Sequence, residues 1–245
     1  MSTLAPDLPL EPRESFADDL AGMGSYFIDP EGAAKRATHK WFWLGPLIVV
    51  SIVAIITQLV RLPITQQVME TMAPPNGMSD AQWAKQSQIS LAFQHVFVWL
   101  SPVVVAIFYL IETGILLAMA SILAGNAKFR TILNIVAGCS LIASLEAIAS
   151  VVVLKMKAPV STIAELKPPL GLDIFLSEGS NKFLMGFLSY FTVFNIWYVV
   201  MMILVLSAAL RISKGKAFAI VLPWIVLTLL FIMVGAAFTP SQSQS

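Results

Sequence analysis

The sequence predicts an all-α integral membrane protein with five transmembrane helices and a short amphipathic surface helix near the N-terminus. Three observations predict this fold class: an apolar composition, five long apolar segments, and a helix start signal ahead of the first segment. Of the 245 residues, 58% are hydrophobic and 12% are charged, and the mean hydropathy is +0.82. A soluble domain carries about 25% charged residues, so this chain has too few polar residues to cover a soluble core.

Charge and cysteine content exclude further classes of protein. The formal net charge is only +1, whereas a nucleic-acid-binding surface is strongly basic, so we expect no nucleic acid among the partners. Cys139 is the single cysteine of the chain. It excludes an intrachain disulfide framework and a four-cysteine metal site.

Five apolar segments are each long enough to cross a bilayer, because a transmembrane helix needs about 20 apolar residues. They cover about residues 41–60, 96–123, 131–154, 183–210 and 217–238. Lipid cannot satisfy open sheet edges, so each segment is predicted to be helical. The stretch "PDLPLEPRESFADD" is acidic and rich in proline, which is typical of disorder. The predicted organisation is a flexible tail over 1–28, a transmembrane domain over 29–238 and a C-terminal tail over 239–245.

Residues 29–40 predict the surface helix. Asp29 is a suitable N-cap and Pro30 suits the first helical position. The aromatic residues at 41–43 come where an aromatic belt forms at a membrane interface. The basic side chains that we assign to the membrane surface are Lys35, Arg36 and Lys40. The alternative interpretation is a basic flank of the first span with no separate helix.

The distribution of lysine and arginine predicts the orientation. Residues 35–40, 124–130 and 211–216 contain basic residues and no acid. Cytoplasmic loops carry an excess of such residues, so the N-terminus is predicted to be cytoplasmic and the C-terminus to lie outside. The two long loops then fall on the outer side. In the first of them, Ser79 and Asp80 are suited to begin a further helix, with a solvated loop as the alternative.

Three polar side chains fall near the middle of predicted spans: Glu112, Glu146 and Asn195. An intramembrane carboxylate is costly and indicates a functional site by default. No lysine or arginine lies deep within a predicted span, so we expect mutual hydrogen bonding, protonation, or both. Small neighbours predict that Glu146 faces the bundle, while bulkier neighbours would let Glu112 meet a partner chain. Two interpretations stay open: ties between helices, or a site for a proton or polar ligand.

The sequence contains no known catalytic pattern. It has no HExxH motif, no GxSxG motif and no glycine-rich phosphate-binding loop. The two histidines, His39 and His95, fall at opposite predicted membrane edges, so they cannot share a metal ion. We therefore predict that the protein is not an enzyme and that it has no metal site and no cofactor.

Four stretches of the sequence resemble the Yip1 family of five-span membrane proteins, related to the Golgi Yip1 and Yif1 proteins. They are "YFIDPEGAAKRATHKWFWLGPL", "GMSDAQWAKQ", "LAGNAKFRTILNIVAGCS" and the region from "LGLDIFLSEGSNKF" to "RISKGKAFAI". The first is similar to the family's short helix before span one, and the third to its glycine turn between spans two and three. The resemblance covers most of residues 26–238. The Asp-Leu-Tyr-Gly-Pro element associated with small-GTPase binding in eukaryotic members is absent from this sequence, so the resemblance does not imply GTPase binding.

The resemblance implies a non-enzymatic multi-pass protein of a bacterial cytoplasmic membrane. Such a protein would act through membrane protein partners or lipids, in a membrane-organisation or trafficking-like role. Its partners would be the lipid bilayer and either another membrane protein or further copies of this chain. The alternative is a transport component, such as a permease or an exporter accessory subunit, that uses the two carboxylates for a proton or polar ligand.

Overall fold

The fold is all-α, as the composition and the apolar segments predict. The computed structural model describes residues 16–74, 77–125, 127–157, 159–160, 164–176 and 180–238. Within these residues the elements are α1 (Phe16–Gly22), α2 (Ser25–Ile28), α3 (Pro30–Arg36), α4 (Leu44–Thr71), α5 (Asp80–Leu123), α6 (Phe129–Met156), the 3-10 turns η1 (Ala164–Leu166) and η2 (Leu172–Phe175), α7 (Lys182–Ser189), α8 (Val193–Leu210) and α9 (Lys214–Phe238). Five of the described helices, α4, α5, α6, α8 and α9, are long and apolar enough to cross a membrane.

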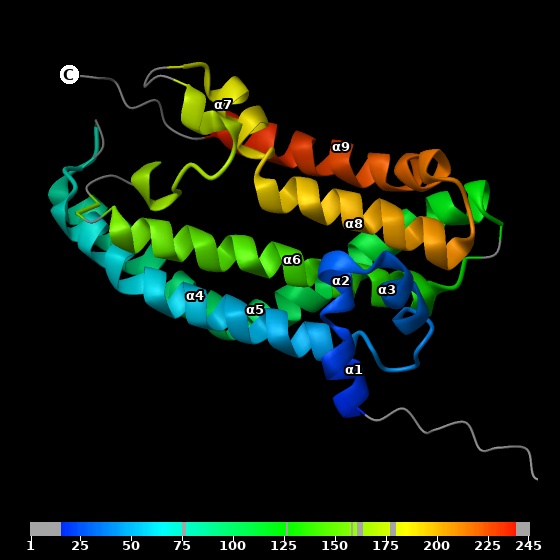
Figure 1. Cartoon of the computed structure of the whole chain (residues 1–245). Helices are drawn as coiled ribbons and strands as arrows, with labels where there is room; N and C mark the ends of the chain where they lie inside the picture. Colours follow the sequence, from blue (N-terminus) through cyan, green and yellow to red (C-terminus); the bar gives the residue numbers. More distant parts are fainter. Residues whose placement is uncertain are drawn as a thin grey trace, which may run out of the picture.

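The long helices form an antiparallel bundle in which α6 is central. Helices α4, α5 and α6 pack against one another, and α8 packs on α6 and α9 (Figure 1). The three short N-terminal helices lie at the end of the bundle where α4 begins (Figure 1). Helices α2 and α3 pack against α6 and α8, and α1 packs on α3 and α4. We call residues 16–36 the N-terminal cover. Helix α7 lies at the opposite end, against α9 (Figure 1).

The N-terminal cover corrects the prediction of a flexible tail over residues 1–28. Residues 16–28 form α1 and α2, with Met23 and Tyr26 buried. The acidic and proline-rich composition predicted disorder, but this segment also contains Met23 and Tyr26. These two side chains pack against the bundle, and this burial stabilises the fold of the segment. Residues 1–15 of the predicted tail, and the predicted C-terminal tail over 239–245, lie outside the described residues.

The short surface helix is present at the predicted position. The Asp29 side chain accepts a hydrogen bond from the backbone N–H of Gly32 at 3.0 Å, and Pro30 occupies the first turn of α3. This is the arrangement of an N-cap followed by proline at the first helical position. Helix α3 buries Ala33 and Ala34 against the bundle, so its inner face meets protein.

Helix α5 is far longer than the predicted span. It runs over 44 residues, which corresponds to a length of about 66 Å. Its start is fixed by a capping box, in which Ser79 accepts from the N–H of Gln82 at 3.3 Å and Gln82 accepts from the N–H of Ser79 at 3.1 Å. The helix predicted to begin at Ser79 is therefore continuous with the second span.

The predicted fourth span is interrupted. Helix α7 ends at Ser189, and α8 begins at Val193 with Thr192 as its N-cap. The Thr192 hydroxyl accepts from the N–H of Asn195 at 3.0 Å, which satisfies a backbone donor that the break would otherwise leave free. Apolar composition alone does not reveal such a break, because both pieces are hydrophobic.

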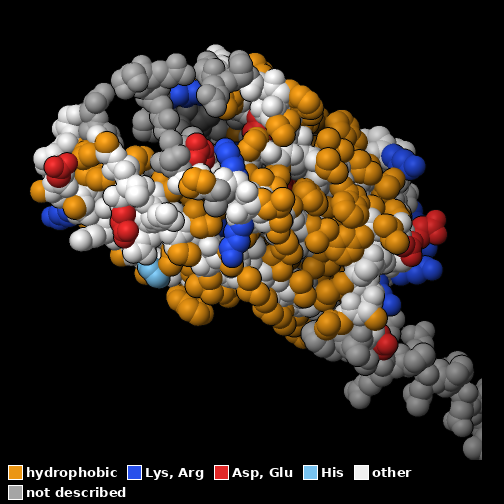
Figure 2. Space-filling model, turned by 60° about the vertical axis from the view of Figure 1, so that its left-hand side comes forward, with side chains coloured by type: hydrophobic (Ala, Val, Ile, Leu, Met, Phe, Trp, Pro, Cys, Tyr) orange, Lys and Arg blue, Asp and Glu red, His pale blue; other side chains and the backbone are white. Residues whose placement is uncertain are grey.

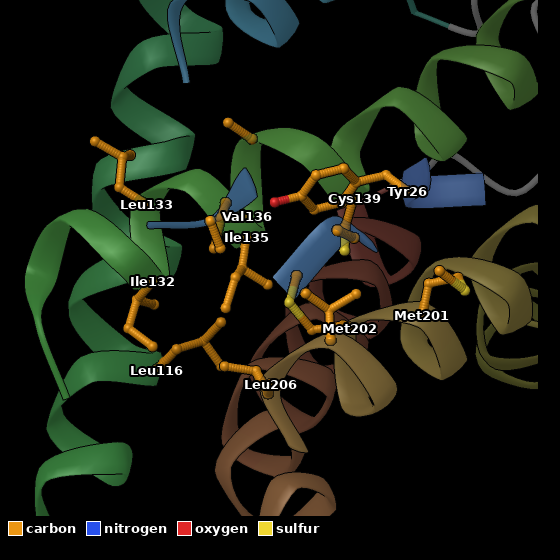
Figure 3. Close-up of a cluster of buried hydrophobic side chains, with 14 of the residues drawn as sticks. Tyr26, Leu116, Ile132, Leu133, Ile135, Val136, Cys139, Met201, Met202 and Leu206 are labelled. Atoms are coloured by element: carbon orange, nitrogen blue, oxygen red, sulfur yellow. The ribbon is translucent and has the colours of Figure 1, made fainter. Parts of the chain in front are cut away.

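The core lies where the N-terminal cover, α5, α6 and α8 meet. Figure 3 shows side chains of these elements converging on α6. The fully buried members include Tyr26, Leu116, Ile132, Ile135, Met202 and Leu206. Away from this core, large apolar side chains are exposed, and Figure 2 shows a broad hydrophobic area across the visible face. In a membrane this area would contact lipid.

Candidate functional site

Glu112 is the most buried of the three predicted polar residues. It lies on α5, is 6% exposed, and its Oε1 accepts a hydrogen bond from the Tyr198 hydroxyl of α8. One turn earlier on α5, the Tyr109 hydroxyl pairs with the Ser140 hydroxyl of α6. These two side-chain pairs join α5 to α6 and to α8 in the bundle interior.

Glu146 has a different partner. Its Oε2 accepts a hydrogen bond from the Thr192 hydroxyl at 3.1 Å, so the carboxylate contacts the break before α8. Asn195 lies beside the same break, where its side-chain amide donates to the carbonyl of Tyr190 at 3.0 Å. The backbone N–H of Asn195 also donates to the Thr192 hydroxyl, so Glu146 and Asn195 both contact Thr192. Within the described residues, no hydrogen bond joins any two of Glu112, Glu146 and Asn195.

The burial of the two carboxylates is the reverse of the expectation from their neighbours. Glu112 is enclosed by protein, whereas Glu146 is half-buried and lines a cavity. The small residues Ala143 and Ala147 beside Glu146 line this cavity instead of packing against a helix. The break between α7 and α8 is the physical reason, because no continuous helix covers this part of α6.

The cavity beside Glu146 is polar and has a volume of about 410 Å³. A second cavity of about 490 Å³ lies between α4 and α5 and has mostly apolar walls, including Leu62, Phe93 and Phe97. Arg61 lines both cavities. The charged residues around the polar cavity are Arg61, Glu146, Lys167 and Asp173.

Arg61 lies beyond the first span predicted over about residues 41–60, but it belongs to the same helix. Helix α4 continues to Thr71 and places Arg61 in its interior. The guanidinium donates through Nη2 to the Ser150 hydroxyl of α6, while its Nε is buried without a hydrogen-bond partner. Apolar residues that continue the helical pattern, such as Leu62 and Val68, were the signal that the helix extends past Arg61.

Asn134 of α6 fixes the chain that leads from the N-terminal cover into α4. Its side-chain amide donates to the carbonyls of Ala37 at 2.9 Å and His39 at 2.7 Å, and its oxygen accepts from the N–H of Trp43 at 3.0 Å. Asn134 is fully buried. The sequence analysis missed it, because an asparagine near the end of an apolar segment carries no distinctive pattern.

Two aromatic contacts hold the N-terminal cover on the bundle. The Trp197 indole of α8 donates to the carbonyl of Phe27 at 2.9 Å. The Tyr26 ring stacks on Phe42 with a centroid distance of 5.2 Å and lies directly over Gly138 of α6, next to Cys139 (Figure 3). Burial raises the pKa of the Tyr26 phenol well above its usual range, so this group is uncharged.

The three predicted surface cations are not equivalent. Lys35 and Lys40 are exposed, and the Lys40 ammonium lies 5.3 Å from the centre of the Trp41 ring. Arg36 instead donates to the carbonyl of Asp18 at 2.7 Å and lies 3.8 Å from the Asp19 carboxylate. Arg36 therefore holds α1 against α3, whereas the two lysines face outward. Over the part of the chain that the structure describes, no group of three or more histidine, cysteine or acidic side chains is arranged to hold a metal ion.

These features define a multi-pass integral membrane protein whose first span is preceded by a docked helical cover. A family model for the Yip1 domain matches residues 24–236, and the chain belongs to the Yip1 family. The match begins at Gly24 and so includes α2 and α3. No curated protein and no solved structure matches the chain.

Proposed function

We propose that this Yip1-family protein is a non-enzymatic membrane protein that acts through lipids or membrane protein partners, in a bacterial cytoplasmic membrane. The observation that carries the proposal is that the most deeply buried polar side chains form hydrogen bonds between helices. Glu112 pairs with Tyr198, and Tyr109 pairs with Ser140, so these side chains tie neighbouring helices together. A protein whose interior is occupied in this way presents its outer surface and its two ends to other molecules.

The proposed orientation has the N-terminal cover in the cytoplasm and the end with α7 outside. The basic residues Lys128, Arg130, Lys214 and Lys216 lie at the helix ends nearest the cover, which supports this orientation through the excess of basic residues in cytoplasmic loops. Reporter fusions after Gly125 and Gly215 should give a cytoplasmic signal, and fusions after Gly77 and Gly171 an external one. A cytoplasmic signal at Gly171 would overturn the orientation.

Site-specific photocrosslinking in native membranes tests how the protein acts. A crosslinker at Phe93 or Trp99, which are 61% and 69% exposed, should capture lipid, a second copy or a defined partner protein. The same positions in a variant with a disrupted cover serve as the comparison. Turnover of a small molecule by the purified chain, with no specific crosslink at either position, would contradict the proposal.

A transport role is the second candidate, and one observation favours it. Glu146 lines an open polar cavity instead of being enclosed by helices. A proton-coupled carrier would lose flux when Glu146 is replaced by Gln, which cannot ionise. A protein that acts through lipids or partners would keep its crosslinking pattern in both Glu112→Gln and Glu146→Gln. Proton flux into proteoliposomes that is abolished by Glu146→Gln alone would favour transport.

A further inference from the structure

We propose that the two cavities that share Arg61 as a lining residue bind one phospholipid whose headgroup carries a primary ammonium. Arg61 would hold the phosphate, Glu146 and Asp173 would hold the ammonium, and the apolar cavity would take part of an acyl chain. The inference rests on the proposed function, because it names the class of lipid through which the protein acts.

The depth of the cavities fits a lipid headgroup. Arg61 lies about 26 Å along α4 from Leu44, and Glu146 lies about 26 Å along α6 from Phe129, at 1.5 Å per residue. The hydrocarbon layer of a bilayer is about 30 Å thick. If α4 and α6 enter this layer near their first residues, both side chains lie close to its far boundary, where lipid phosphates are found.

Arg61 has the chemistry of a phosphate ligand. Its Nη2 is engaged by Ser150, but its Nε is buried with no partner, and no carboxylate among the described residues forms an ion pair with it. A buried donor without a partner is costly, and a guanidinium matches a phosphate through parallel N–H donors. An anion in the cavity would satisfy both the charge and the unpaired donor.

The polar cavity also contains the carboxylates of Glu146 and Asp173. Their charge favours a headgroup that carries a positive charge. The Thr192 hydroxyl engages Oε2 of Glu146, and no described residue donates to Oε1. The carboxylate of Asp173 accepts only the N–H of Gly171 at 3.1 Å, through Oδ1. Lys167 interacts electrostatically with Glu146 and donates to the Ser189 hydroxyl at 3.2 Å. A ligand with both a phosphate and an ammonium matches this mixture of two cations and two carboxylates, whereas a purely anionic headgroup would add a negative charge beside Glu146 and Asp173 and bring no cation of its own.

The apolar cavity indicates a lipid in preference to a soluble zwitterion. Its apolar lining includes Phe93, Phe97, Val98 and Leu154, and Arg61 lines both this cavity and the polar one. The remaining lining is polar and includes Gln58, Thr65, Ser90 and Gln94. A molecule that fills both cavities must carry an apolar part directly attached to its phosphate. A phospholipid has this structure, and a soluble phosphoethanolamine has only the polar half.

Native mass spectrometry of the purified full-length protein provides the test. The protein is exchanged into detergent with phosphatidylethanolamine, phosphatidylglycerol or phosphatidylcholine, and the retained lipid is titrated. We expect phosphatidylethanolamine to bind at least about tenfold more tightly than the other two, the scale of one charge-assisted hydrogen bond. Phosphatidylcholine lacks N–H donors and phosphatidylglycerol lacks the cation, so each should lose the contact with the acidic pair.

Two substitutions test which residue contacts the phosphate of the lipid and which contacts its ammonium. Arg61→Gln should weaken all three lipids by about tenfold or more, because each contains the phosphate. Glu146→Gln should abolish the preference for phosphatidylethanolamine over phosphatidylglycerol, and a glutamine can still accept from Thr192. Arg130→Gln and Glu70→Gln are the matched controls, because both side chains are exposed and lie outside the cavities. Both controls should bind as the unmodified protein does.

Several results would overturn the inference. If the unmodified protein bound phosphatidylethanolamine and phosphatidylglycerol equally, the inference would be overturned. This result needs no variant, so it holds even if Arg61→Gln fails to fold. Full displacement of the bound lipid by soluble phosphoethanolamine at equal concentration would assign the site to the free headgroup. A protein that keeps its photocrosslinks but shows no headgroup preference would contradict only this inference, whereas small-molecule turnover with the preference intact would contradict only the proposed function.

Discussion

The two ends of the helical bundle differ in the charge of the buried group that each leaves without a hydrogen bond. At the cover end, the Asn134 side chain makes three hydrogen bonds to the backbone, and the Trp197 indole makes another. At the cavity end, Arg61 keeps a buried donor without a partner, and Glu146 lines an open cavity. Buried polar groups in proteins are normally paired. Among the described residues the Tyr26 hydroxyl at the cover end is also buried without a partner, but it is uncharged, whereas Arg61 is a cation. A buried charge without a counter-charge is the costlier of the two, so the cavity end is the one suited to an anionic ligand. At the cover end, the hydrogen bonds of Asn134 and Trp197 instead stabilise the fold.

The largest effect is expected from Asn134→Leu at the cover end. The substitution leaves two carbonyls and one N–H without their partner, so the free energy of unfolding in detergent should fall by about 3 kcal/mol. Limited proteolysis should also become faster within residues 16–36. Asn195→Leu is the control, since its amide donates to one carbonyl only. An equal loss in the two variants would show that the cover end has no special contribution.

Gly138→Ala should destabilise the same end through steric overlap. An added Cβ at this position would lie 2.2 Å from Cε1 of Tyr26, so the ring and the cover must move. Such overpacking typically costs about 1–3 kcal/mol. Gly114→Ala is a matched control, because its Cβ would meet no atom within 4 Å.

A double variant distinguishes this overlap from a general loss of helix packing. Tyr26→Leu combined with Gly138→Ala should cost less than the sum of the two single substitutions, because the two side chains occupy the same space. The measurement is the free energy of unfolding of the four proteins. Additive losses would mean that Tyr26 does not transmit the effect of Gly138 to the cover.

Glu112→Leu should destabilise the bundle by about 1–2 kcal/mol, the scale of a hydrogen bond between membrane helices. Glu112→Gln should be nearly neutral, because an amide still accepts from Tyr198. Glu146→Leu should cost less than Glu112→Leu, since Glu146 is half-buried and bonds only to Thr192. Unfolding measurements on Glu112→Leu, Tyr198→Phe and the double variant test the pairing, and strict additivity would argue against it.

The smallest effect is expected at the outer surface of the cover. Lys35→Gln should reduce the stabilisation that anionic lipid gives to the protein by at most about 1 kcal/mol, the contribution of one basic residue near such a surface. The measurement compares unfolding in nanodiscs with and without anionic lipid, at low and high salt. Arg36→Gln should destabilise the protein equally in both nanodiscs, because its guanidinium contacts Asp18 and Asp19. A lipid-dependent effect of Arg36→Gln would reverse these assignments.

The sequence predicted the fold class well because each transmembrane helix is determined by a local property. Apolar length predicted the number of spans, and Asp29 and Ser79 were recognised as N-caps from residue type alone. These signals need no knowledge of distant contacts. The Yip1 resemblance is confirmed by the family model, which matches residues 24–236.

The sequence predicted the site less well because the site depends on contacts between distant residues. Glu112 and Glu146 look alike as isolated carboxylates in apolar segments, yet one meets Tyr198 and the other meets the break at Thr192. Arg61 was assigned to a loop because a charge normally ends an apolar segment. Its hydrogen-bond partner, Ser150, lies 89 residues further along the chain, so this contact could not be read from the local sequence.

The length of α5 determines how far the protein reaches beyond the lipid. A helix of about 66 Å crosses a hydrocarbon layer of about 30 Å with several turns remaining. The polar first turns after Ser79 therefore stand above the bilayer at a height set by the number of residues between them and the apolar segment. Adding one residue there would turn the tip by about 100°, whereas adding seven would raise it by about 10 Å and restore nearly the same facing direction. Helix α5 thus sets the height and the direction of the tip independently.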